Sequence, residues 1–340
     1  MKLLRLLGVL AILPAVAHCA APASEDTSDS ATGADELRSL PSQPADSAEL
    51  PADYDSTSAL DKQNMLGQLI SRGQYCAKGE ARETCQPKLP TGGFSYYLRA
   101  IPALLSLHPT FYFSSDEAPE GRRKIFHPFG VAGEAEFVPD YSENHHAPYS
   151  GLLARGPAVP LILRMAPGGG PNLIPGASVK FLIDGKPSRN FVAIHDFGGV
   201  PKNNWNYFQQ DIGHIYPDVP FVVKAYFELF TPDPSHLPVT HLGEISPNGA
   251  DVPKAQQSTP YEIVLRGNAA VAKRFPNTDQ HDFRFDLEQI EPGTAVYDVM
   301  ARPTRDDPKF ERVGIIRTKS ALVASSGGDK QLFFKHPGAK

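Results

Sequence analysis

Cysteine, tryptophan and long apolar runs are scarce in this chain of 340 residues, which contains three Cys and one Trp. The most marked apolar stretch, residues 6–17, is too short to span a bilayer as a mature helix, so we expect no transmembrane segment. The body of the chain also lacks an excess of either charge, because residues 61–340 are close to neutral. A nearly neutral body offers no electrostatic footprint for nucleic acid, which excludes that class of partner.

The first 21 residues have the pattern of a secretory signal peptide. Lys2 and Arg5 precede the apolar run, and small residues follow it. Such a leader predicts a secreted or periplasmic protein. A lipoprotein would instead be acylated at Cys19, but His18 just before it fits poorly to the small-residue cleavage site of that class.

An acidic segment follows the leader. Residues 21–60 hold nine acidic side chains against one basic side chain, and the segment is rich in Ala, Ser and Pro. It has too little apolar surface to offset the loss of chain entropy on folding, so we expect a disordered tether at residues 22–57. Because 41% of the whole chain is apolar, the rest can form a packed core, and we expect one domain at residues 58–340.

Cys76 and Cys85 are the two cysteines that remain once the leader is removed. An exported chain meets an oxidising environment, so we predict that they form a disulfide. The loop between them is short, and such a bridge stabilises a domain by about 2 to 3 kcal/mol. It therefore holds a local turn and cannot by itself support the fold. Two buried thiols are the other reading of this pair.

The pattern of apolar residues in the folded part predicts an α+β fold. Short alternating runs separated by Gly and Pro indicate an antiparallel barrel or sandwich, and a few stretches have helical spacing. We expect helices at residues 58–71, 95–107, 203–215 and 221–230. We expect strands at residues 124–126, 135–138, 159–165, 178–183, 191–194, 261–265, 295–301 and 313–317.

Four segments in series resemble one protein family. Lys-Ile-Phe-His-Pro-Phe-Gly at residues 124–130 leads into Gly-Glu-Ala-Glu-Phe at 133–137, and the later segments lie at 159–165, 175–185 and 190–196. Together they resemble the first strands of the haem catalases, beginning with the strand that carries the distal histidine. The resemblance is good from about residue 120 to 200 and weaker from 295 to 335. It implies a catalase-like antiparallel β-barrel with flanking helices.

The resemblance also implies roles for individual residues. His127 matches the distal histidine, which takes a proton from a bound hydroperoxide and returns it to the departing oxygen. Arg164 matches the arginine that pairs with a haem propionate, and an ordinary charge at the barrel rim is its other reading. Lys124 stands where the family has another arginine near the haem. The distal amide maps to Ser188 without gaps, or to Asn190 with a shift of two. The implied substrates are hydrogen peroxide and organic hydroperoxides.

The residue that ligates the iron in this family is missing from its usual setting. That ligand is a tyrosine in an Arg-x-x-x-Tyr motif, and none of the 12 tyrosines here has an arginine four residues before it. Three alternatives stay open: the iron lacks the usual ligand, it takes another such as His336, or no haem is bound.

Two other functions also stay open. A catalase-like barrel without its proximal helix could bind a small apolar ligand and no haem. Possible lining residues are Phe126, Phe129, Trp205 and Phe208, although such aromatics are more often core residues. A haem-free enzyme using His195 or His127 is the third possibility, and no particular reaction is indicated. The oligomeric state is open as well.

Overall fold

The structure of the chain is a computed structural model. It describes residues 59–89, 127, 129–142, 149–166, 176–184, 189–194, 208, 212–214, 239–275, 282–304, 306–332 and 334. The predicted signal peptide, the acidic tether and the predicted helices at 95–107 and 221–230 lie outside these residues.

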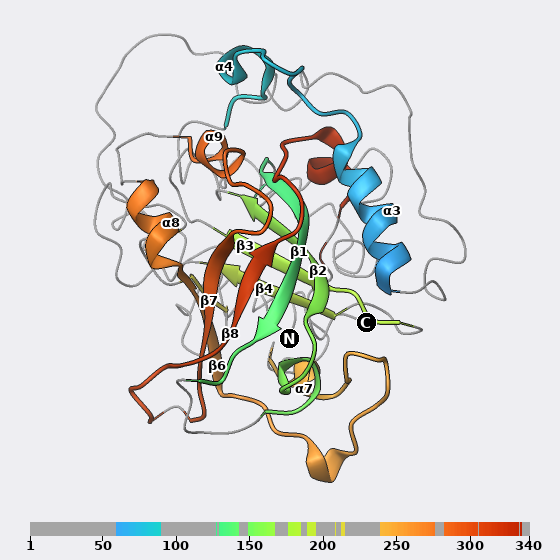
Figure 1. Cartoon of the computed structure of the whole chain (residues 1–340), viewed down its shortest axis with the longest axis vertical. Coiled ribbons are helices and arrows are strands. Elements are labelled where there is room, and N and C mark those ends of the chain that lie inside the picture. The colour runs from blue at the N-terminus through green and yellow to red at the C-terminus, as the bar shows by residue number, and fades with distance from the viewer. Residues whose placement is uncertain are drawn as a thin grey trace, which may run out of the picture.

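Eight antiparallel strands form a closed barrel (Figure 1). Each strand pairs with the next along the chain, and the last returns to pair with the first. The expectation of an antiparallel barrel with helices beside it is confirmed. The strands are β1 (Val131–Pro139), β2 (Val159–Ala166), β3 (Gly176–Phe181), β4 (Arg189–Ile194), β5 (Ile212–His214), β6 (Glu262–Gly267), β7 (Ala295–Arg302) and β8 (Glu311–Thr318).

Alternation along the strands separates the barrel interior from its outer face. Successive side chains of a strand point to opposite faces, so the apolar residues at every second position gather inside. Phe137 of β1, Leu163 of β2 and Phe181 of β3 belong to this interior cluster. The Phe137 and Phe181 rings meet edge to face with centroids 6.2 Å apart. The interior is therefore filled with side chains.

A second, smaller cluster lies on the outer face and is covered by α3 (Ala59–Ser71). Leu66 and Leu69 of this helix pack with Ala132 of β1 and Ile162 of β2. These contacts confirm the helix predicted at residues 58–71. Each leucine buried in this way stabilises the fold by about 1.5 to 3 kcal/mol, which fixes α3 beside the first two strands.

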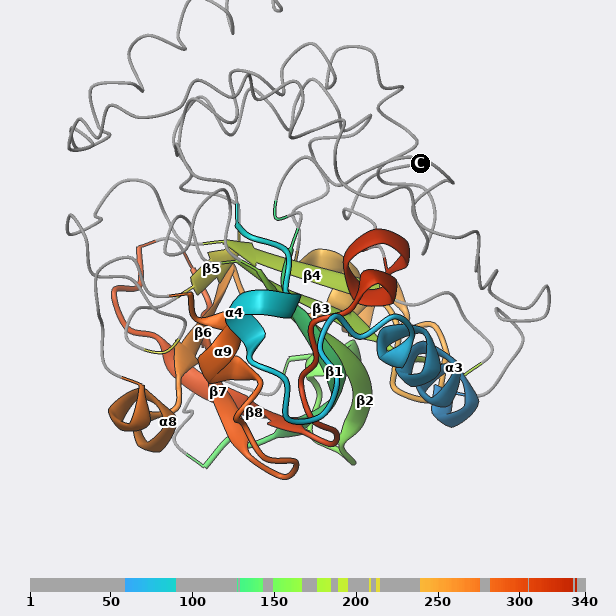
Figure 2. The same cartoon turned by 90° about the horizontal axis from the view of Figure 1, so that it is seen from above.

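Short helical turns lie around the barrel and in the loops between its strands (Figures 1 and 2). In both views α4 lies beside α9, and the π-helical turn η6 lies beside α3. These turns are α4 (Arg82–Cys85), η4 (Gly151–Leu153), α7 (Thr240–Gly243), η5 (Lys254–Gln256), α8 (Ala269–Arg274), α9 (Arg284–Leu287) and η6 (Gly327–Gln331). No helix in the described part of the chain is both long and apolar enough to cross a membrane.

One predicted element is wrong. A helix is expected at residues 203–215, but the last residues of this range that the structure describes, Ile212–His214, form the strand β5. The backbone of β5 pairs with β4 on one side and with β6 on the other. Without a strand at this place β4 and β6 would leave unpaired backbone groups, so sheet pairing outweighs the local apolar spacing.

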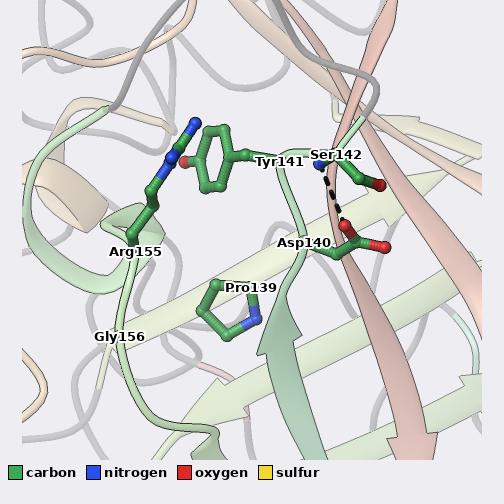
Figure 3. A pocket seen from close by; sticks show the side chains of 6 residues that line it. All are labelled: Pro139, Asp140, Tyr141, Ser142, Arg155 and Gly156. Carbon is green, nitrogen blue, oxygen red and sulfur yellow. Dashed lines mark hydrogen bonds between the residues drawn. The ribbon is translucent and has the colours of Figure 1, made fainter.

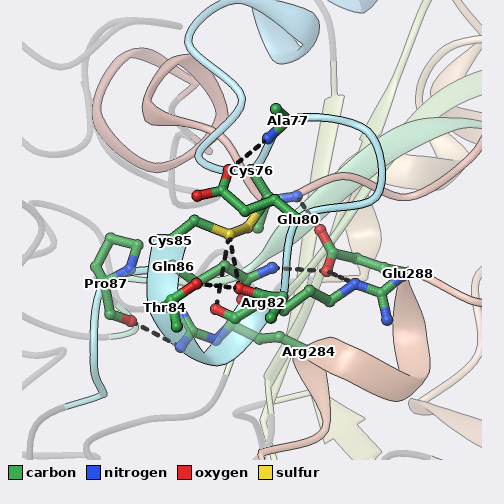
Figure 4. Close-up of a disulfide and its surroundings, with 12 residues drawn as sticks. Cys76, Ala77, Glu80, Arg82, Thr84, Cys85, Gln86, Pro87, Arg284 and Glu288 are labelled. Carbon is green, nitrogen blue, oxygen red and sulfur yellow. Dashed lines mark hydrogen bonds and ion pairs between the residues drawn. A yellow bond between two sulfur atoms is a disulfide. The ribbon is translucent and has the colours of Figure 1, made fainter.

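The predicted disulfide is present. Cys76 and Cys85 are bonded, with Cα atoms 5.2 Å apart (Figure 4). Glu288, at the end of α9, holds the bridged loop by accepting a hydrogen bond from Gln86 at 2.6 Å and pairing with Arg82 at 3.1 Å. The bridge thus fixes a local turn that is fastened to α9.

Candidate functional site

His127 precedes β1 and has an unusual backbone conformation. Its φ is +53°, in the left-handed region that non-glycine residues seldom adopt. Its Nδ1 lies 2.7 Å from the carbonyl oxygen of Ala166, the last residue of β2. Because a carbonyl oxygen can only accept a hydrogen bond, we infer that Nδ1 carries the proton. Nε2 then keeps its lone pair and can accept a proton.

Small residues allow the His127 ring to lie against the barrel backbone. A Cβ placed on Gly176, the first residue of β3, would lie 2.7 Å from the ring carbon Cε1. A Cβ on Gly130 would lie 2.4 Å from the carbonyl oxygen of Met165. Both positions therefore need glycine for the ring and the turn after it to sit where they do.

His127 is a neutral imidazole near pH 7. Loss of solvation lowers the pKa of its ring to about 4, and the positive charge of Arg164 acts in the same direction. The hydrogen bond to the Ala166 carbonyl opposes this shift but does not cancel it. A neutral ring with one free lone pair is the form that a general base requires.

Arg164 of β2 lies on the same outer face as Ile162 and forms a buried ion pair with Asp329 of η6. The guanidinium Nη2 and the carboxylate Oδ1 are 3.0 Å apart, and their side chains are 5% and 2% exposed. The same nitrogen also donates to the backbone oxygen of His127 at 3.0 Å. The Nε of Arg164 is buried and finds no hydrogen-bond partner among the described residues.

Asp329 connects several segments of the chain. Besides Arg164, its carboxylate accepts a hydrogen bond from the backbone N–H of Gly130 at 2.9 Å and from the Tyr75 hydroxyl at 3.2 Å. Burial and the nearby carboxylate raise the pKa of Tyr75, which stays protonated. Sequence reasoning did not select Asp329 or Tyr75. Their sequence separation of 254 hides their contact from any local pattern.

Asn190 of β4 does not join this cluster. Its amide oxygen accepts a hydrogen bond from Lys180 of β3 at 3.1 Å, and both side chains are buried. It lies four residues before Ile194, the residue of β4 that pairs with Gly176 beside His127. Four residues of strand span about 13 Å. The structure therefore does not bring Asn190 next to His127, and its role as a distal amide stays a prediction.

The remaining predicted site residues are placed as follows. Lys124, Ser188 and His336 lie outside the described residues, and so do Phe126, Trp205 and His195. Phe129 is buried. Phe208 packs in the main core, with its ring centroid 5.8 Å from that of Tyr297, so it behaves as a core residue.

A separate open pocket of about 370 Å³ lies where β1 ends (Figure 3). Tyr141 and Arg155 form one side of it, with the guanidinium 5.4 Å from the ring centroid. Asp140, on the other side, accepts a hydrogen bond from the Ser142 N–H. Since His127 precedes β1 and this pocket follows it, the two sites lie toward opposite ends of the strand.

The chain was also compared with known proteins. It matches no protein-family model, and no curated protein or solved structure is significantly similar to it.

Proposed function

We propose that the protein is a secreted or periplasmic, haem-dependent catalase-like or peroxidase-like protein that acts on hydrogen peroxide or organic hydroperoxides. The observation that carries the proposal is His127, a neutral imidazole whose Nδ1 is engaged and whose Nε2 is left to accept a proton. It lies in the segment whose sequence resembles the distal strand of haem catalases. The disulfide between Cys76 and Cys85 is compatible with an oxidising compartment.

The chemistry assigned to His127 is the movement of one proton. Nε2 takes the proton from the O–H of the hydroperoxide and later gives it to the oxygen that departs as water or as an alcohol. The hydrogen bond from Nδ1 to the Ala166 carbonyl keeps the ring in the tautomer that this exchange needs. Haem, when bound, supplies the electrons for cleavage of the O–O bond.

Two features of the described residues fit a haem group. Arg164 has a buried Nε without a hydrogen-bond partner in the described part of the chain, and a propionate oxygen could accept from it. Asp329 and the backbone oxygen of His127 both engage Nη2 of the same guanidinium. The second feature is the His127 ring, whose Nε2 keeps its lone pair while Gly176 gives the ring room against β3. For the iron ligand, His336 remains a prediction.

The proposal is tested by an absorption spectrum from 300 to 700 nm, recorded on mature protein produced with a haem precursor. We expect a Soret band in proportion to the protein, and consumption of hydrogen peroxide. His127→Ala should retain the band and lose about 10²- to 10⁴-fold in turnover. The control is Arg312→Met, beside the pocket at the other end of β1, which should turn over peroxide as the wild type does.

Two outcomes would overturn the proposal. A featureless spectrum that persists after titration with haem would show that the protein binds no haem. The alternative is then a haem-free barrel that binds a small apolar ligand. Unchanged turnover in His127→Ala, with the Soret band retained, removes the mechanism and leaves the cofactor in place.

A further inference from the structure

We propose that Asp329 is the positioning residue of this site, and that it acts through Arg164 and Gly130 to hold His127 in the backbone conformation that directs Nδ1 to Ala166. The catalytic meaning of this role rests on the proposed function. The geometry itself can be tested without haem or peroxide.

The turn at His127 needs an external restraint. A histidine with φ of +53° is held in a conformation that most L-residues avoid, because Cβ crowds the backbone there. The surrounding structure must therefore favour this conformation over the ordinary ones. Two hydrogen bonds do so, one at each end of the turn. Arg164 donates to the carbonyl of His127, and the N–H of Gly130 donates to Asp329.

Both restraints meet at one carboxylate. Oδ1 of Asp329 accepts from Arg164 at 3.0 Å and from Gly130 at 2.9 Å, while Oδ2 accepts from Tyr75. The turn before β1 and the guanidinium bonded to it are thus both held by Oδ1 of Asp329. Removing the carboxylate releases both ends of the turn together.

Asp329 is itself rigidly placed. Its backbone N–H donates to the carbonyl of Ser325 at 2.9 Å, and the hydroxyl of Ser325 accepts from Gly328 at 2.9 Å. That hydroxyl also donates to the carbonyl of Ile70 in α3. The turn η6 is therefore bonded to the helix that covers β1 and β2, so the carboxylate cannot follow His127 if the histidine moves.

The charge that acts on the His127 ring is that of Arg164, which is paired with Asp329. The Arg164 charge disfavours a protonated ring, and its pairing with Asp329 leaves the site nearly neutral. The pair therefore combines an attachment point for the turn with a balanced charge. A guanidinium without Asp329 would provide the attachment point but would leave its positive charge unbalanced.

The test is the tautomer and titration of His127, followed in long-range ¹H–¹⁵N spectra of the full chain labelled with ¹⁵N-histidine. His127→Gln identifies the signal. In the wild type we expect the proton on Nδ1 and a titration midpoint near pH 4. Asp329→Ala removes the carboxylate, Asp329→Asn keeps an oxygen that can accept from Gly130, and Arg164→Met with Asp329→Leu removes both charges at once.

We expect Asp329→Ala and the double variant to lose the fixed tautomer, and we expect the double variant, which has no guanidinium beside the ring, to titrate closer to the ordinary histidine pKa of 6.5. Asp329→Asn should retain the fixed tautomer, as a conservative variant does. The matched control removes an exposed pair of the same kind, Arg312→Met with Asp140→Leu, and should leave the His127 signal unchanged.

The double variant decides the matter if Asp329→Ala does not fold, because apolar replacement of a whole buried pair is often tolerated. A folded double variant that keeps the wild-type tautomer and midpoint overturns the proposal. Unfolding of the double variant at pH 7 overturns it as well, since the pair would then be needed for the barrel as a whole. Failure to bind haem would not change the ¹H–¹⁵N spectra of the wild type or of the variants. The proposed function and the proposed role of Asp329 can therefore fail separately.

Discussion

The two ends of strand β1 carry the same kind of ion pair in opposite surroundings. Near its start, Arg164 and Asp329 are 5% and 2% exposed and hold the turn of His127. Just after its end, Arg312 and Asp140 form a 2.9 Å pair with 24% and 34% of their side chains exposed, next to the open pocket. Residue types and distances alone would not distinguish the two pairs.

The two pairs differ in how much the free energy of unfolding falls when one partner is removed. Two charges taken out of water must be compensated by each other and by further hydrogen bonds, and loss of one partner leaves a buried charge uncompensated. An exposed pair loses little, because water replaces the missing partner. The buried end of β1 is therefore expected to be sensitive to single substitutions, and the exposed end tolerant of them.

The largest expected effect tests this comparison directly. Arg164→Met should lower the free energy of unfolding by about 3 to 5 kcal/mol, because it leaves the Asp329 carboxylate without its cation. Arg312→Met should lower it by about 1 kcal/mol or less. Urea unfolding of both variants at pH 7 provides the measurement. Equal losses would show that burial does not separate the two ends.

Removal of the disulfide should lower the stability by a smaller amount. The bridge begins at Cys76, next to Tyr75, which contacts Asp329 at the buried end of β1. Replacing both Cys76 and Cys85 by Ser should cost about 2 to 3 kcal/mol, according to the chain-entropy arithmetic for a short loop. Thermal unfolding with and without a reductant measures the loss, and the double variant should no longer respond to the reductant. A wild-type protein whose melting temperature ignores the reductant would contradict a stabilising role.

The smallest effect is a difference in the slope of stability against pH, which for one titrating group is at most about 1.4 kcal/mol per pH unit. The folded-state pKa of His127 is about 4 and the ordinary value is 6.5, so between these values the unfolded chain binds more protons than the folded one. Stability from this group is present above pH 6.5 and is lost as the pH falls toward 4. Urea unfolding across this window should show a shallower dependence for His127→Gln than for the wild type.

Asp140 at the other end behaves differently with pH. Hydrogen bonds from Ser142 lower its pKa below the ordinary 3.8, so its contribution is present above that value and is lost only as the pH falls below it. Asp140→Asn should therefore leave the slope between pH 4 and 6.5 as it is in the wild type. A change of that slope in Asp140→Asn, with none in His127→Gln, would reverse the assignment of the two ends.

Much of the barrel could be predicted from the sequence because its strands alternate. Ala135 and Phe137 of β1, and Leu161 and Leu163 of β2, occupy every second position and all lie in the interior cluster. The strand β5 was missed because three residues are too few for alternation to be visible. Its conformation is set by β4 and β6, which are remote in sequence.

Only those residues of the site that lie in a recognisable local sequence pattern could be predicted. His127 could be selected from its neighbours in the sequence, and Arg164 from the strand that follows. Asp329 and Tyr75 could not, because a Gly-Gly-Asp turn and a tyrosine before a cysteine have no feature that indicates a shared contact. Only the closed barrel brings them together, and the link between sequence and site is then entirely tertiary.

The closure of the barrel has a consequence for the order in which the parts of the protein fold. β1 needs β8 as its second neighbour, and Asp329 follows β8 by only a short stretch of chain. β1 keeps an open edge until β8, which is remote from it in sequence, is in place. Contacts over such long sequence separations form slowly. His127 thus acquires its final surroundings late in folding, and a chain without β8 and η6 would keep the histidine without the contacts that hold its turn.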